Sequence, residues 1–214
     1  MTAFIEESRL RAHKLKDEQA RCAVLTYDAF LQMTRDEPEA AADGIEQVFA
    51  MTSQEGFSGW QLLASLRQLR LLLYTGQVEE AWTRLGPLWK RFTKEGLHQI
   101  PAFATHAIDL RAAITLSEFK RTGNVALAKQ ARGYIKTMAT NGRSDWAAMG
   151  FQHRGALAKI EGGDALADLK TAATTFDEAG LQLRAALCRA HLGQSSLDVA
   201  NPARFLDAFA PGFA

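Results

Sequence analysis

Four arginines at equivalent places are the residues whose type and spacing most suggest chemistry in this chain. Each follows a leucine or a histidine inside a segment rich in alanine and leucine, and the four are Arg67, Arg111, Arg154 and Arg184. A guanidinium group carries a planar fork of N–H donors that matches a carboxylate or a phosphate. On successive helices of a stack, the four side chains would line the concave face. We therefore expect them to bind acidic or phosphorylated side chains of an extended peptide.

The recurrence of these arginines also has a packing interpretation. A long arginine side chain can lay its apolar stem across a neighbouring helix and pair with a carboxylate there. Asp168 and Glu80 are suitable partners for such pairs. Because repeated positions recur for packing as readily as for ligand binding, both interpretations stay open.

Histidine spacing gives no sign of a metal site. A zinc site needs three or four convergent ligands. No two of the five histidines stand at a metal-ligand spacing; they are His13, His98, His106, His153 and His191. His106 and His153 fall on the predicted concave helices near the arginines, so both are secondary candidates for binding a partner. We predict no metal and no cofactor.

The sequence also lacks the signatures of a catalytic site. Cys22 and Cys188 lie in predicted helices at opposite ends of the chain, with no neighbouring base to activate them, so we expect small buried residues. There is no Gly-x-Ser-x-Gly, no glycine-rich nucleotide loop and no Gly-x-x-x-x-Gly-Lys-Ser/Thr. We therefore predict that the protein is not an enzyme.

Glycines at recurring places define the elements that must position these side chains. Glycine just after a helix takes the left-handed conformation that ends it at little cost. One series is expected to end the first helix of each pair, at Gly76, Gly123, Gly163 and Gly193. A second series is expected to end the second helix, at Gly56, Gly96, Gly142 and Gly180. In the first pair, the stretch from Arg35 to Pro38 takes the place of the missing glycine.

A repeat of about 40 residues with two helices per unit is typical of an α-solenoid. We predict an all-α fold, a right-handed α-solenoid of helix-turn-helix repeats, that forms a single domain over residues 1–214. The expected helix pairs cover about 4–56, 60–97, 101–142 and 146–180, and a short terminal pair covers 181–209.

Two motifs carry a resemblance to known families. The turn pattern Gly-x-Val-x-x-Ala, as in Gly76 to Ala81, resembles the tetratricopeptide repeat in its longer bacterial variant. The ending, Asn201-Pro202-Ala203-Arg204 followed by Ala210-Pro211-Gly212-Phe213, is similar to the close of helical regions at the end of large bacterial serine/threonine protein kinases and related ATPase-containing regulators. In those kinases the region is non-catalytic, so the resemblance implies an interaction or regulatory role, attached to or associated with a kinase or ATPase module.

Charge and composition exclude several classes of partner. The 214 residues are 47% hydrophobic and carry a net charge of +1, which argues against disorder and lacks the basic excess of a nucleic-acid-binding protein. No apolar run is long enough for a signal peptide or a membrane span. We expect a cytoplasmic protein that binds neither nucleic acid nor membrane.

The sequence thus predicts a non-catalytic scaffold that binds a protein or an acidic peptide, as a regulatory or sensing module of bacterial signalling. The alternative is a domain that senses or transforms a small molecule, held in the groove by His106, His153 and the arginines. A deep pocket with convergent polar groups would favour the alternative, and a shallow open groove would count against it.

Overall fold

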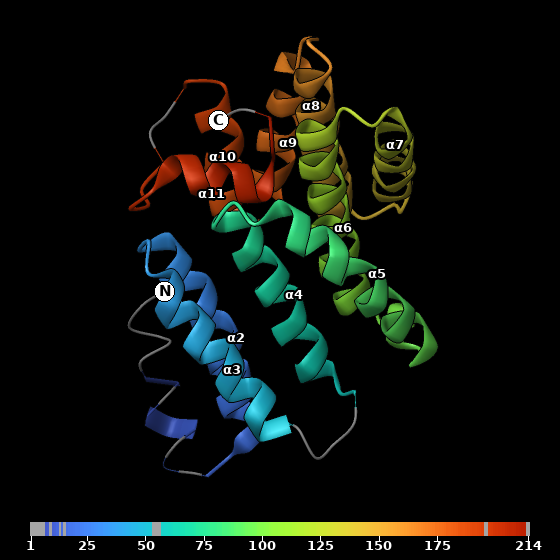
Figure 1. The fold of residues 1–214 in the computed structure, drawn as a ribbon. Coiled ribbons are helices and arrows are strands. Elements are labelled where there is room, and N and C mark those ends of the chain that lie inside the picture. Colours follow the sequence, from blue (N-terminus) through green and yellow to red (C-terminus); the bar gives the residue numbers. More distant parts are fainter. Residues whose placement is uncertain are drawn as a thin grey trace.

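The part of the chain that the structure describes is built from helices and contains no strand, which confirms the predicted all-α class (Figure 1). The computed structural model describes residues 7–8, 10–12, 14, 16–52, 57–194 and 197–212. The helices are α2 (Glu18–Thr34), α3 (Pro38–Thr52), α4 (Gly59–Tyr74), α5 (Val78–Lys94), the 3-10 turn η1 (Leu97–Gln99), α6 (Pro101–Thr122), α7 (Val125–Ala139), α8 (Ser144–Ile160), α9 (Leu166–Glu178), α10 (Gln182–His191) and α11 (Pro202–Phe209). These bounds agree closely with the predicted pairs after residue 16.

Glycines with positive φ follow most of these helices, as the sequence predicts. They are Gly76, Gly96, Gly123, Gly142, Gly162, Gly180 and Gly193. One assignment is wrong by a residue, because Gly162 with φ of 78° and not Gly163 takes the left-handed conformation after α8. Gly56 lies outside the described residues. In the first pair Asp36 adopts φ of 58° and Pro38 begins α3, so this stretch does replace a glycine stop.

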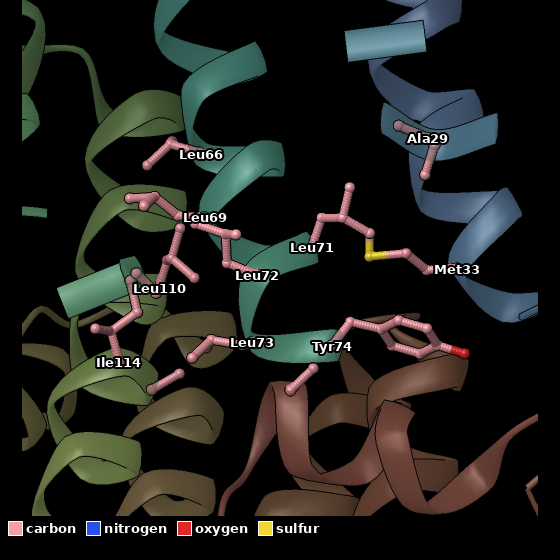
Figure 2. Close-up of a cluster of buried hydrophobic side chains, with 14 of the residues drawn as sticks. Ala29, Met33, Leu66, Leu69, Leu71, Leu72, Leu73, Tyr74, Leu110 and Ile114 are labelled. Atoms are coloured by element: carbon pink, nitrogen blue, oxygen red, sulfur yellow. The ribbon is translucent and has the colours of Figure 1, made fainter. Parts of the chain in front are cut away.

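From α2 to α10 each helix packs against the next one along the chain, and alternate helices also pack together, α2 on α4, α4 on α6 and α6 on α8. The helices α4, α6 and α8 are therefore buried on several sides. In α4 this burial is continuous from Leu69 to Tyr74. Figure 2 shows how it is divided: Leu71 points toward Met33 of α2, whereas Leu69 points toward Leu110 of α6.

The C-terminal helix α11 lies against α4 and α6, two helices that are far from it in sequence (Figure 1). Phe205 and Phe209 each meet the ring of Phe30 in α2 edge to face, with ring centroids 5.7 Å apart. The backbone N–H of Ala200 donates to the carbonyl of Thr34 over 2.8 Å. The last helix thus closes the inner side of the helix stack.

Within the described residues, none of the helices combines the length and the apolar character that a membrane crossing requires.

Candidate functional site

Asp109 of α6 lies at the centre of a buried network of ionisable side chains. Its Oδ2 accepts from Nη2 of Arg70 in α4 at 2.7 Å and from Nη2 of Arg184 in α10 at 2.5 Å. Its Oδ1 lies 2.8 Å from Nε2 of His153 in α8. Arg70, Asp109 and His153 are all buried. One carboxylate therefore joins four helices.

The two arginines of the network have further partners. Nη1 of Arg70 donates to the carbonyl of Ala208 in α11 at 2.5 Å, and its guanidinium lies over the ring of Phe209, 4.3 Å from the centroid. Nη1 of Arg184 donates to Oε1 of the buried Gln152 at 2.8 Å. Buried charges are tolerated when they are paired and hydrogen-bonded in this way.

The ionisation of the network follows from its contacts. Burial opposes charge on Asp109, but Arg184, Arg70 and the hydrogen bond with His153 outweigh it and hold the pKa of the carboxyl well below its usual value. Burial also lowers the pKa of the His153 imidazole, against the influence of Asp109. At neutral pH the network is therefore two guanidinium cations, one carboxylate and a neutral imidazole.

A cavity of about 540 Å³ opens beside this network, between α2, α4, α6, α8, α10 and α11. Four charged residues line this cavity. Three of them, Arg70, Asp109 and Arg184, belong to the network, and the fourth is Arg67. Most of the remaining wall is apolar, formed by Phe30, Leu66, Leu110, Met149, Leu181, Leu183, Leu187 and Phe209, with Tyr27 and His106 beside them. This combination of an apolar wall with a few charged groups is typical of a ligand site.

Arg67 is the charged residue of this cavity that lacks a counter-ion. Within the described part of the chain it makes no hydrogen bond or ion pair, and its guanidinium only approaches the ring of Phe30, 5.5 Å from the centroid. Burial lowers the pKa of Arg67, with a smaller opposing influence from Tyr27, but an arginine stays charged at neutral pH. The cavity is thus lined by three guanidinium groups and one carboxylate, that of Asp109, so its net charge is positive.

The two candidate histidines have different positions. His106 lines the cavity and is exposed, and partial burial together with the charge of Arg67 lowers the pKa of its imidazole. His153 is fully buried behind Asp109, and its Nδ1 has no hydrogen-bond partner among the described residues. His106 can therefore meet a ligand in the cavity, whereas His153 positions Asp109.

The predicted single row of four arginines is wrong. Arg67 and Arg184 line the cavity, but Arg154 pairs with Asp168 of α9, with Nη2 and Oδ1 2.5 Å apart, as the packing interpretation expected. Arg111 is stacked between two rings, 3.9 Å from the centroid of Trp89 and 4.6 Å from that of Tyr134. The four positions are equivalent in sequence, but their side chains have different partners. The suggested partner Glu80 pairs instead with Arg84.

Catalytic chemistry has little support in the described residues. The Asp109–His153 pair resembles part of a catalytic triad, but the other ring nitrogen of His153 is buried and contacts no hydroxyl or thiol. Cys22 and Cys188 are buried, as predicted, and burial raises the pKa of the Cys188 thiol to about 12. No group of three or more His, Cys, Asp or Glu side chains in these described ranges could hold a metal ion.

Sequence reasoning missed the residues at the centre of the site. Arg70 stands among leucines near the end of α4, and Asp109 stands between Ile108 and Leu110 in an apolar stretch of α6. A charge surrounded by apolar neighbours on a buried helix must find a partner. That rule would have singled out both residues, although not their pairing.

Comparison of this chain with protein-family models, with curated proteins and with solved structures gave no match.

Proposed function

We propose that this chain is a non-catalytic binding module, a right-handed tetratricopeptide-like stack of helix pairs whose inner cavity receives an acidic group of a protein or peptide ligand. The observation that carries the proposal is Arg67, a half-buried guanidinium that lines a partly apolar cavity and has no counter-ion among the described residues. An incoming carboxylate would supply that counter-ion and accept from the N–H donors of the guanidinium. The cavity also opens to solvent at Tyr27 and Leu181, both exposed apolar side chains.

The proposed biological setting comes from the sequence. The C-terminal motif Asn201-Pro202-x-Arg204 and the turn motifs resemble the non-catalytic helical regions of bacterial signalling kinases and ATPase-containing regulators. We propose on this basis a regulatory or sensing role in the bacterial cytoplasm, with a kinase or ATPase module as the attached or associated partner.

A peptide selection tests the binding function. We expect a display library of 12-residue peptides to yield ligands with at least one acidic residue on the unmodified protein, and Arg67→Met to lose them, because methionine keeps the apolar stem without the charge. Arg154→Met is the matched control, since Arg154 already pairs with Asp168 outside the cavity. Equal selection by all three proteins, or no enrichment on the unmodified protein, would contradict a binding role at Arg67.

A second candidate function is favoured by the size of the cavity. A volume of about 540 Å³ falls within the range of about 300–1,000 Å³ that small-molecule sites occupy. Convergent polar groups, namely Arg67, Arg184 and His106, were the feature expected of a small-molecule sensor. The charged groups and the apolar wall of the cavity restrict the chemistry of such a ligand.

A further inference from the structure

We infer that the cavity beside Arg67 binds a small monocarboxylate with an apolar body, the carboxylate on Arg67 and the body against the apolar wall. This inference rests on the proposed binding function and narrows its ligand from any acidic group to one chemical class.

The pairing of the three guanidinium groups in the cavity indicates the charge of the ligand. Arg70 and Arg184 are both committed to Asp109, and each spends a further N–H on Ala208 or Gln152. Of the three arginines in this cavity, Arg67 is the one that makes no hydrogen bond or ion pair with any described residue. One guanidinium fork matches one carboxylate in a bidentate pair. A phosphate carries more charge and more oxygen atoms than this single fork can satisfy.

The apolar side chains that line the cavity indicate that the ligand has an apolar body. Phe30, Leu66, Leu187 and Phe209 line the same cavity as Arg67, and the ring of Phe30 lies 5.5 Å from its guanidinium, so a ligand whose carboxylate reaches Arg67 would place its remaining atoms against an apolar wall. Tyr27 is 59% and Leu181 36% exposed, and both also line the cavity, so their side chains are accessible to a ligand that enters it. Burial of such a body would supply most of the affinity, at roughly 25 cal/mol for each Å² of apolar surface removed from water.

His106 adds a polar group at the same end of the cavity. Its imidazole is held neutral at physiological pH by partial burial and the charge of Arg67. A neutral imidazole donates from one ring nitrogen, and its N–H can approach the second oxygen of a carboxylate without adding charge. Asp109 does not repel the ligand strongly, because Arg70, Arg184 and His153 already surround its two oxygens.

Isothermal titration calorimetry of the full chain with four probes measures separately what the carboxylate and the apolar body contribute to binding. Octanoate has both the carboxylate and the body, octan-1-ol lacks the charge, acetate lacks the body, and inorganic phosphate tests the other common anion. We expect octanoate to bind with a stoichiometry of about one, and the other three to bind at least about tenfold more weakly, because each loses a charged hydrogen bond or its buried apolar surface.

Variants of Arg67 test whether this residue binds the carboxylate of the ligand. Arg67→Met should weaken octanoate binding about 10- to 100-fold while leaving octan-1-ol unchanged, since only the charged contact is removed. Arg67→Lys should restore part of the affinity, because lysine keeps the charge but not the fork. Arg154→Met is the control outside the cavity. A near-ultraviolet circular dichroism spectrum shared with the unmodified protein shows that each variant is folded.

The outcomes decide both proposals. Equal binding of octan-1-ol and octanoate, equal binding of octanoate by Arg67→Met, or displacement of octanoate by phosphate at comparable concentration would overturn the monocarboxylate inference. If octanoate fails to bind while selected acidic peptides bind in an Arg67-dependent manner, the inference falls and the binding function stands. If neither octanoate nor any peptide binds, both are overturned.

Discussion

At the scale of single residues, Asp109 is the carboxylate on which the inner side of the molecule depends. It is 2% exposed and is the shared partner of Arg70, Arg184 and His153, which come from three other helices. Removing one member of a buried ion network leaves the others uncompensated, and this costs far more than the pair itself contributes. Replacing Asp109 would therefore deprive Arg70, Arg184 and His153 of the carboxylate with which all three interact.

Asp109→Asn should lower the free energy of unfolding by about 3–5 kcal/mol, because the buried guanidinium of Arg70 and the partly buried one of Arg184 lose their counter-charge. The measurement is urea denaturation followed by far-ultraviolet circular dichroism. The matched control is Asp168→Asn, which breaks the more exposed pair with Arg154 and should change stability by about 1 kcal/mol or less. Equal losses in the two variants would show that Asp109 is no more important than a surface ion pair.

The network could be anticipated only in part from the sequence. Charged residues inside the apolar stretches of α4 and α6 mark Arg70 and Asp109 as buried groups in need of partners. The pairing of Asp109 with Arg184 depends on how α10 returns toward α6, and Arg184 is 75 residues away from Asp109 in the chain. Long-range geometry of this kind has no local signal, so the sequence pattern places the four equivalent arginines in one row, whereas the structure brings only Arg67 and Arg184 to the cavity.

At the scale of elements, the contact between α7 and α8 depends on a glycine. A Cβ at Gly150 of α8 would lie 3.2 Å from the backbone nitrogen of Ala139 and 3.3 Å from the carbonyl oxygen of Ile135, both in α7. The two helix backbones therefore approach more closely than a side chain at this position would allow. Gly133 of α7 is a contrasting case, because a Cβ there would meet nothing within 4 Å.

Alanine substitutions at these two glycines should have opposite effects. Gly133→Ala should raise the free energy of unfolding by up to about 1 kcal/mol, since alanine is the better helix former in open space. Gly150→Ala should lower it, because α8 must shift away from α7 despite the same gain in helix propensity. Thermal denaturation of both variants measures the difference. A stabilising Gly150→Ala would mean that the two helices are not held at this distance.

Helix bounds were the part of the fold most accessible from the sequence, because the signals for them are local. Asn124 accepts from the backbone N–H of Ala126 and Asn201 from that of Arg204, at the beginnings of α7 and α11. Such caps and glycine stops act within one helical turn, so they can be recognised without the tertiary structure. The two adjacent glycines after α8 carry the same local signal, so the sequence does not distinguish Gly162, which ends the helix, from Gly163.

At the scale of the whole molecule, α11 joins the two ends of the described chain. Phe205 is fully buried and meets Phe30 of α2 and Tyr74 of α4 edge to face. The helices α2 and α11 therefore share one cluster of buried side chains. Contacts of this kind make the unfolding of the two ends cooperative.

Phe205→Ala should lower the free energy of unfolding by about 3–5 kcal/mol, the usual cost of removing a large buried aromatic ring. Because the ring serves both ends, amide hydrogen exchange should accelerate in α2 as well as in α11. Urea denaturation gives the stability, and exchange followed by mass spectrometry gives its distribution. Faster exchange confined to α11 would show that this helix is an appendage and not part of the cooperative unit.

The position of α11 also governs the order in which the protein can fold as it is synthesised. Arg70 and Asp109 leave the ribosome early, but Arg184 and the carbonyl of Ala208, which complete their network, follow only with the last helices. A nascent chain lacking those helices holds buried charges with partners missing and an apolar face of α4 uncovered. Synthesis of α10 and α11 is then the step that completes this core, and until those helices emerge the early helices expose an apolar face that chaperones can bind.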